Sequence, residues 1–174
     1  MAKRAELISL VLFILAFMTA CGGTQAPLPK IETRPLEEVK AGPIIEEALA
    51  ARGYAFDRNV SVMVARGTEF EADYKVRGEK IAIEYLTKED RRTIGELPPP
   101  GEGSRLHVVN GRFVGGNGEA PSQVFVLFID DRNFVYHANP TPEVRADVTF
   151  LEVDSRLRRD ISDFIEWYKD TQKR

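Results

Sequence analysis

The residues with the clearest chemical potential are two carboxylates, Asp73 and Glu84, on neighbouring predicted strands. Apolar and polar side chains alternate over residues 70–76 and 81–86, which is the period of half-buried strands. When the two segments are paired about the turn between them, Val76 faces Ile81, Tyr74 faces Ile83 and Ala72 faces Tyr85, so one face of the hairpin is apolar on both strands. The same register places Asp73 directly opposite Glu84, with Cβ atoms about 5 Å apart.

Facing like charges destabilise a sheet unless a cation or a shared proton relieves the repulsion. Four interpretations of the pair follow: a solvated pair on an exposed face, a divalent-cation site, the acids of a hydrolase, or a pair buried under the first helix. We take the solvated pair as the expectation. If the pair is functional, Asp73 and Glu84 are the candidate metal ligands, and Lys75, on the same face, joins them as a candidate catalytic residue.

One acid on each of two successive strands after an initial helix resembles the restriction-endonuclease-like nuclease core. The matching stretch runs from Phe70 to Tyr85. This resemblance implies metal-dependent hydrolysis of phosphodiester bonds, or an inactive relative that keeps the fold. That family places a lysine two residues after the second acid, where this chain has Leu86, so Lys75 would have to substitute for it.

Other candidate groups lack the spacing of a known site. The two histidines, His107 and His137, are not part of an HExxH or CxxC pattern, so a zinc site is not expected. The glycine-rich residues 115–118 lack the lysine of a phosphate-binding loop. Several arginines could bind anions, although a solvated helix face is the simpler interpretation: Arg156, Arg158 and Arg159, with Arg91 and Arg92.

The only cysteine, Cys21, follows a segment with the pattern of an export signal. Lys3 and Arg4 precede residues 7–18, twelve residues of which only Ser9 is polar. A helix of that length rises roughly 18 Å, too short for a hydrocarbon core of about 30 Å. The segment therefore suits the core of a signal peptide.

The sequence Met18-Thr19-Ala20-Cys21 resembles the lipobox of bacterial lipoproteins, with Met18 where leucine is usual. The resemblance implies cleavage after Ala20 and acylation of Cys21, which would attach the chain to membrane lipid. The expected location is the cell envelope, at the outer membrane or on the periplasmic side. An ordinary secretory signal or an uncleaved anchor are the alternatives. A lone cysteine in an exported chain has no disulfide partner, and acylation would remove its thiol.

Removal of residues 1–20 would leave 154 of the 174 residues, and 24 basic and 27 acidic residues would become 22 and 26. Such a mildly acidic chain argues against a broad nucleic-acid surface. Residues 21–34, rich in Gly and Pro, are predicted to form a flexible tether, and residues 35–174 a single domain. Besides the membrane, an envelope protein is the expected partner.

The predicted domain is α+β, with a mostly antiparallel sheet and three helices. The first helix is predicted to start at Pro43, and a shorter helical turn from Leu36 to Ala41 could precede it. The short middle helix spans 88–97, and a C-terminal amphipathic helix starts after Asp154. Asn110-Gly111 predicts a type I′ hairpin turn. The predicted strands are 60–64, 70–76, 81–86, 106–109, 112–114, 124–129, 134–137 and 148–153.

The function expected from the sequence is that of a membrane-anchored envelope lipoprotein with a non-enzymatic binding or scaffolding domain. The alternative is a hydrolase that uses Asp73 and Glu84 with a divalent cation. No other cofactor is expected.

Overall fold

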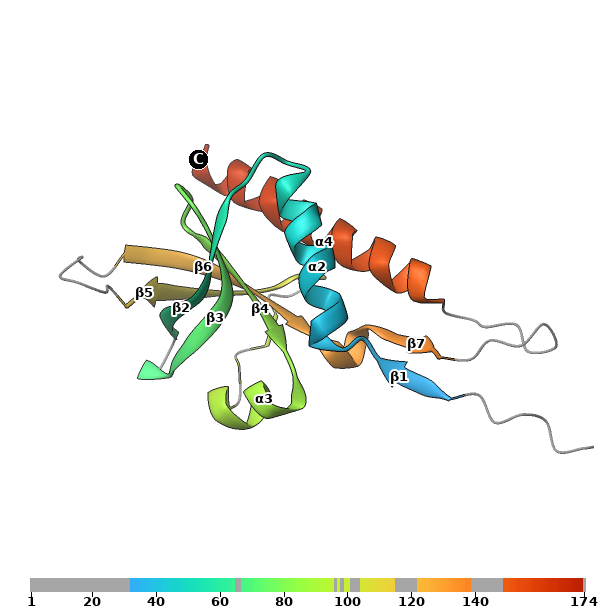
Figure 1. Ribbon diagram of the computed structural model, residues 1–174. Coiled ribbons are helices and arrows are strands. Elements are labelled where there is room, and N and C mark those ends of the chain that lie inside the picture. Colours follow the sequence, from blue (N-terminus) through green and yellow to red (C-terminus); the bar gives the residue numbers. More distant parts are fainter. Residues whose placement is uncertain are drawn as a thin grey trace, which may run out of the picture. The chain divides into compact units, whose positions relative to one another are not determined.

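The computed structural model describes residues 32–64, 67–95, 97, 99–100, 104–114, 122–138 and 149–173. The predicted signal segment, Cys21 and most of the predicted tether lie outside these residues. The elements, shown in Figure 1, are β1 (Thr33–Pro35), α2 (Glu38–Ala50), β2 (Phe56–Val64), β3 (Glu69–Val76), β4 (Ile81–Leu86), α3 (Lys88–Ile94), β5 (His107–Phe113), β6 (Ser122–Asp130), η2 (Asp131–Asn133), β7 (Val135–His137) and α4 (Phe150–Gln172).

The α+β class predicted from the sequence is confirmed, but the main sheet is mixed and closed. Five strands form a barrel in the order β2-β3-β4-β6-β5. Strands β4 and β6 are parallel, whereas the other neighbours in the barrel are antiparallel. Parallel neighbours need a long crossover, which α3 and β5 provide between β4 and β6. The first strand, β1, pairs with β7 in a separate two-stranded sheet, so the end of the predicted tether is extended and paired.

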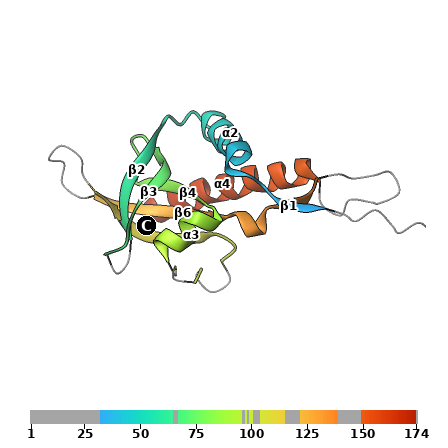
Figure 2. The same cartoon turned by 60° about the horizontal axis from the view of Figure 1, so that its bottom comes forward.

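Two apolar clusters lie on opposite sides of the barrel wall. The outer cluster joins the strands to α2 and α4, which cross each other on this side of the barrel (Figure 1). The inner cluster fills the barrel, and Ile94 of α3 belongs to it. Helix α3 therefore lies against the lower end of the barrel, as the turned view shows (Figure 2). Odd-numbered residues of β4 face outward and even-numbered residues face inward, so this strand is buried along its whole length.

The helix starts show which sequence signals decided the local structure. The capping box that opens α3 is confirmed, because Thr87 and Asp90 exchange side-chain and backbone hydrogen bonds. Helix α2 starts at Glu38 rather than at Pro43, which lies inside the helix. Ala41 is buried there and extends the apolar stripe toward the N-terminus. This burial offsets the hydrogen bond that proline cannot donate.

The last predicted strand is wrong within the described residues. Phe150 to Val153 form the first turn of α4, and Thr149 is its N-cap in place of Asp154. Thr149 and Glu152 form a second capping box, which the alternating apolar residues concealed. Val153 is fully buried in the outer cluster. The first residue of the predicted strand, Val148, lies outside the described residues.

The predicted hairpin at Asn110-Gly111 is also wrong, because β5 runs straight through both residues. Gly111 pairs with Val64 of β2 at the seam that closes the barrel. A Cβ atom at this position would lie 2.9 Å from the carbonyl oxygen of Met63. The glycine is therefore needed for close approach of two strands and not for a turn.

Among the helices of the described residues, none combines the length and the apolar character needed to cross a bilayer.

The seam predicts that Gly111→Ala destabilises the domain, because the added methyl group meets backbone rather than a movable side chain. We expect a loss of about 1–3 kcal/mol in the free energy of unfolding, measured by urea denaturation. Asn110→Ala is the matched control, since Asn110 is exposed on the same strand. Equal stability of the Gly111→Ala and Asn110→Ala proteins would contradict the tight seam.

Candidate functional site

The structure brings Asp73 and Glu84 together in the predicted register. Tyr74 pairs with Ile83, and Lys75 pairs with Ala82, as predicted. At Asp73, the next residue toward the N-terminus of β3, hydrogen bonds to the two carboxyl groups take the place of backbone-to-backbone pairing. The Asp73 backbone N–H donates to Glu84 Oε2 at 3.2 Å, and the Tyr85 backbone N–H donates to Asp73 Oδ2 at 2.7 Å.

This exchange occurs where β3 separates from β4, a place that we call the fork. Tyr74 and Val76 of β3 pack in the outer cluster, whereas Phe70 and Ala72 pack inside the barrel. In a regular strand these four even-numbered residues would lie on one face. Strand β3 therefore changes sides at Asp73. In the β2–β3 register, Asn59 falls opposite Asp73, and it has a φ of 54°. Asparagine tolerates this left-handed conformation better than most residues. The strands diverge visibly below this point in Figure 1.

The expected solvated pair is wrong, because the fork buries Glu84. Its side chain is 3% exposed, while Asp73 is half-buried. Burial, and then repulsion from Asp73 and Asp90, raise the pKa of Glu84 to about 9. Burial also raises the pKa of Asp73 to about 6, against the opposing effect of the Tyr85 hydrogen bond. At neutral pH the pair thus holds one proton, on Glu84, and one negative charge.

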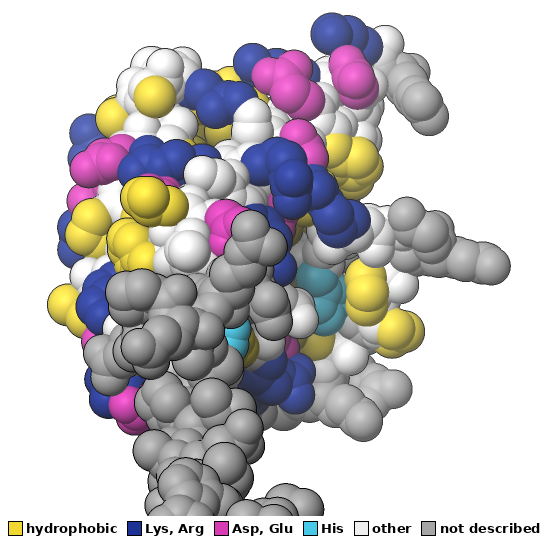
Figure 3. Space-filling model, turned by 90° about the vertical axis from the view of Figure 1, so that its right-hand side faces the viewer, with side chains coloured by type: hydrophobic (Ala, Val, Ile, Leu, Met, Phe, Trp, Pro, Cys, Tyr) yellow, Lys and Arg dark blue, Asp and Glu magenta, His cyan; other side chains and the backbone are white. Residues whose placement is uncertain are grey.

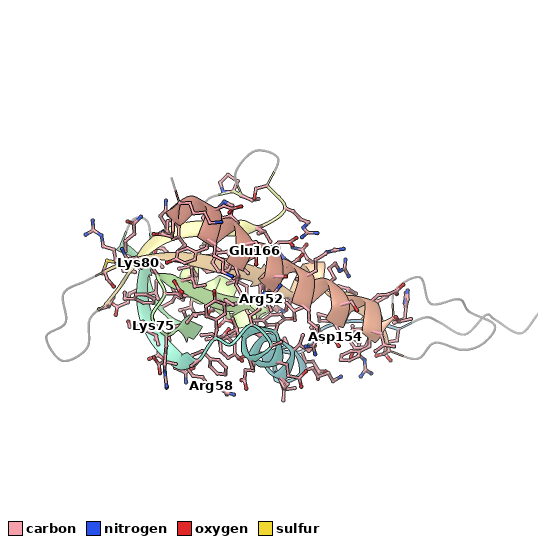
Figure 4. The ribbon with its side chains drawn as sticks, turned by 90° about the horizontal axis from the view of Figure 1, so that it is seen from above. Arg52, Arg58, Lys75, Lys80, Asp154 and Glu166 are labelled. Atoms are coloured by element: carbon pink, nitrogen blue, oxygen red, sulfur yellow. The ribbon has the colours of Figure 1, made fainter. Side chains whose placement is uncertain are left out.

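The groups that metal-dependent hydrolysis would need are not gathered around this pair. Among the described residues, no group of three or more His, Cys, Asp or Glu side chains is placed to hold a metal ion. Leu86, at the position of the family's lysine, packs inside the barrel. The Lys75 ammonium lies 4.5 Å from the centre of the Phe113 ring. Seen from above, Arg58 lies beside α2, and Lys75 lies farther from that helix (Figure 4).

A pocket of about 490 Å³ opens beside Asp73, between α2 and the β2–β3 ribbon. Its polar side chains are largely paired with each other. Glu46 accepts hydrogen bonds from Arg58 and from the Tyr74 hydroxyl, and the Tyr85 hydroxyl donates to the carbonyl of Leu36. The lining residues are Glu38, Val39, Gly42, Pro43, Ile45, Glu46, Arg58, Asp73, Tyr74 and Tyr85.

A second pocket, of about 470 Å³, lies between α4, η2 and strands β5 and β6. Arg156 and Arg159 of α4 line it with Arg105 and His107, so the structure brings two of the arginines singled out in the sequence together. Arg158 instead bonds to Glu47 of α2 and to Asp154. Arg91 bonds to Asp130 and Asp131. Sequence reasoning missed Arg105, because its proximity to α4 depends on the path from α3 to β5.

The raised pKa values make stability depend on pH with a definite sign. The folded protein keeps protons that the unfolded chain releases above roughly pH 4. The stabilisation is therefore complete below that pH and is lost as pH rises through the folded pKa values of about 6 and about 9. We expect unfolding free energy to fall with a slope of up to about 1.4 kcal/mol per pH unit for each group.

Glu84→Gln, which stays neutral, should remove most of the slope between about pH 6 and 9 and should be more stable than the wild type at the alkaline end. Urea denaturation across this range measures both effects. Glu71→Gln, at an exposed carboxylate of β3, is the control and should keep the wild-type slope. An unchanged slope in the Glu84→Gln protein would show that the fork is not the titrating site.

Comparison with known proteins adds no relative to this picture. Scans against family models, curated proteins and solved structures each found no match. The residues of this chain and their geometry are therefore the basis for any proposal about its function.

Proposed function

We propose that the chain is a lipoprotein of the bacterial cell envelope, anchored through acylated Cys21, with a domain that binds a partner without catalysing a reaction. The anchor would lie in the outer membrane or on the periplasmic side. The proposed partners are membrane lipid, through the acyl chains, and an envelope protein.

The main support for a non-catalytic domain is the pair of hydrogen bonds across the fork, in which each carboxyl group accepts from the backbone of the other strand. Asp73 and Glu84 each accept a backbone N–H from the opposite strand, so both serve to hold the diverging strands. Glu84 is buried and protonated at neutral pH, and a divalent cation would have to displace that proton. These features support a structural role for the pair.

The anchor is supported by the apolar segment 7–18 and the single cysteine that follows it. Strand β1 starts at Thr33, so eleven residues, 22–32, would separate Cys21 from the first strand. Such a segment reaches at most about 40 Å when extended. The domain would then stand close to the membrane surface.

The alternative function is a metal-dependent phosphodiester hydrolase, or an inactive relative of one, with a restriction-endonuclease-like core. Its support is that two carboxyl groups converge on adjacent strands beside the pocket under α2. Asp73 and Glu84 would be the metal ligands and acids, and Lys75 would have to turn away from Phe113 to assist. The requirement for a cation separates this alternative from the binding domain.

The cation requirement can be tested with the purified protein. We expect Mn²⁺ or Mg²⁺ to leave the melting temperature unchanged and to produce no cleavage of DNA or RNA, because Glu84 is protonated at neutral pH and the cation would have to displace that proton. A metal-dependent rise in melting temperature, absent from Asp73→Asn but present in the exposed control Glu71→Gln, would favour the hydrolase.

The anchor is tested by cell fractionation. We expect the wild-type protein in the membrane fraction and mature-sized Cys21→Ser protein in the soluble fraction, because the acyl chains supply about 0.8 kcal/mol of membrane affinity per buried methylene. Thr19→Ser, which keeps the cysteine, should behave as the wild type. Mature-sized Cys21→Ser protein that stays with the membrane would refute the acyl anchor.

A further inference from the structure

The second pocket lies next to the strand where the described chain begins. Phe134, which lines the pocket, accepts a hydrogen bond at 2.7 Å from the backbone N–H of Leu36, just after β1. Pro35 of β1 pairs with Val135 of β7. If Cys21 is acylated, the eleven residues before Thr33 would keep the start of β1 within about 40 Å of the membrane, so that this part of the domain could reach the surface.

Arginines dominate the charged groups of this pocket. Asp130 is already bonded to Arg91 at 3.0 Å and to Arg132 at 2.9 Å. The surrounding ion pairs involve four aspartates and four arginines, and Arg156 adds a fifth guanidinium. One positive charge is thus in excess here, although the whole chain carries a net charge of −3.

Arg156 is the arginine best placed to accept an anion. In the described part of the chain no carboxylate lies within ion-pair distance of it, and its guanidinium lies 5.5 Å from the centre of the Phe134 ring. Phe134 thus holds the guanidinium over the pocket without neutralising it. Arg159, one turn along α4, is 4.0 Å from the nearest oxygen of Asp160 and remains largely exposed. A space-filling view from the side shows Lys and Arg side chains gathered near a histidine (Figure 3).

Asp160 provides a hydrogen-bond acceptor in the same pocket, in contrast to the arginines, which are donors. Its Oδ1 atom is buried and accepts no hydrogen bond from the described residues, although Arg105 Nη2 lies 3.1 Å away. The Arg105 guanidinium compensates the charge of this oxygen but is not aligned to donate a hydrogen bond to it, so the oxygen can still accept one. A hydroxyl group that entered the pocket beside the arginines could donate to this oxygen.

We propose that this pocket binds the headgroup of an anionic phospholipid that carries a hydroxyl group, such as phosphatidylglycerol. The phosphodiester oxygens accept hydrogen bonds from Arg156 and Arg159, and the glycerol hydroxyl donates to Asp160 Oδ1. Leu127 and Ile129 of the outer cluster also line the pocket, and such apolar neighbours lower the local polarity and strengthen these bonds. The inference deepens the proposed function, because the lipid surface in question is the one that holds the acyl anchor.

The experiment uses the protein purified from its own membranes and reconstituted in vesicles with dansyl-labelled lipid. Trp167 is the only tryptophan, so energy transfer from it to the label reports how close the domain lies to the surface. We compare phosphatidylcholine vesicles with vesicles that also contain phosphatidylglycerol or phosphatidylethanol, which has the same charge but no headgroup hydroxyl. We expect transfer to be highest with phosphatidylglycerol and lowest with phosphatidylcholine alone.

Two double variants distinguish binding in the pocket from general electrostatic attraction to the anionic surface. Arg156→Gln/Arg159→Gln should weaken docking on phosphatidylglycerol vesicles roughly 30-fold, since each basic residue near an anionic surface contributes about fivefold. The matched control Arg158→Gln/Lys169→Gln removes the same charge from the same helix, at residues paired with Glu47, Asp154 and Glu166. It should dock as the wild type does.

Three results would overturn the proposal. Equal losses in the two double variants would indicate diffuse attraction, and equal transfer with phosphatidylethanol would remove the role of Asp160. If inorganic phosphate raises the melting temperature of the wild type but not of Arg156→Gln/Arg159→Gln, while anionic vesicles change nothing, the pocket binds a free anion. The mass of the purified protein reports separately whether Cys21 is acylated, so failure of the anchor is distinguished from failure of the pocket.

Discussion

The bonding of two carboxyl groups to backbone N–H groups at the fork is the constraint on which the rest of the fold depends. In the barrel, β3 pairs with β4 only at Tyr74 and Lys75, and the rest of β3 diverges together with β2, which pairs with β5. Separation of two strands exposes backbone donors, and a buried donor without a partner costs about 1–3 kcal/mol. Asp73 and Glu84 satisfy those donors at the point where the ladder stops. The raised pKa of Glu84 keeps it neutral at pH 7, which removes most of the repulsion between the two carboxyl groups.

The other features of the sheet follow from this separation. Once β3 has turned, the far end of the β2–β3 ribbon faces the barrel interior, and its free edge meets β5 at Gly111. On the other side of the fork, β4 is left beside β6 as a parallel neighbour and is covered outside by α2 and α4. Ile94 of α3 then packs into the barrel next to residues of β3 and β4. Strands β3, β4 and β6 each contribute to both clusters, and every residue of β4 is buried.

The sequence predicts local structure well where one interaction decides it. The β3–β4 register follows from matched apolar partners, and the start of α3 follows from Thr87 and Asp90. Prediction fails where a distant contact decides. Asn110-Gly111 has the chemistry of a turn, but the glycine serves the approach of β2, a strand far away in the sequence. The burial of Glu84 could not be predicted for the same reason, since period-two alternation does not tell a solvated face from the inside of a closed barrel.

The two pockets differ in what they leave available to a ligand. Around the first, the hydrogen-bonding capacity of the acids is largely used, because Glu46 is paired with Arg58 and Tyr74, and Asp73 is bonded to the backbone of β4. Around the second, and among the described residues, Arg156 has no carboxylate within ion-pair distance, and Asp160 Oδ1 accepts no hydrogen bond although Arg105 lies 3.1 Å away. Unsatisfied groups of opposite character in one apolar pocket favour a ligand with both an anionic group and a hydroxyl donor. The acid pair is bonded to the backbone of the diverging strands, whereas the arginines on which the proposed recognition depends come together only through the tertiary structure.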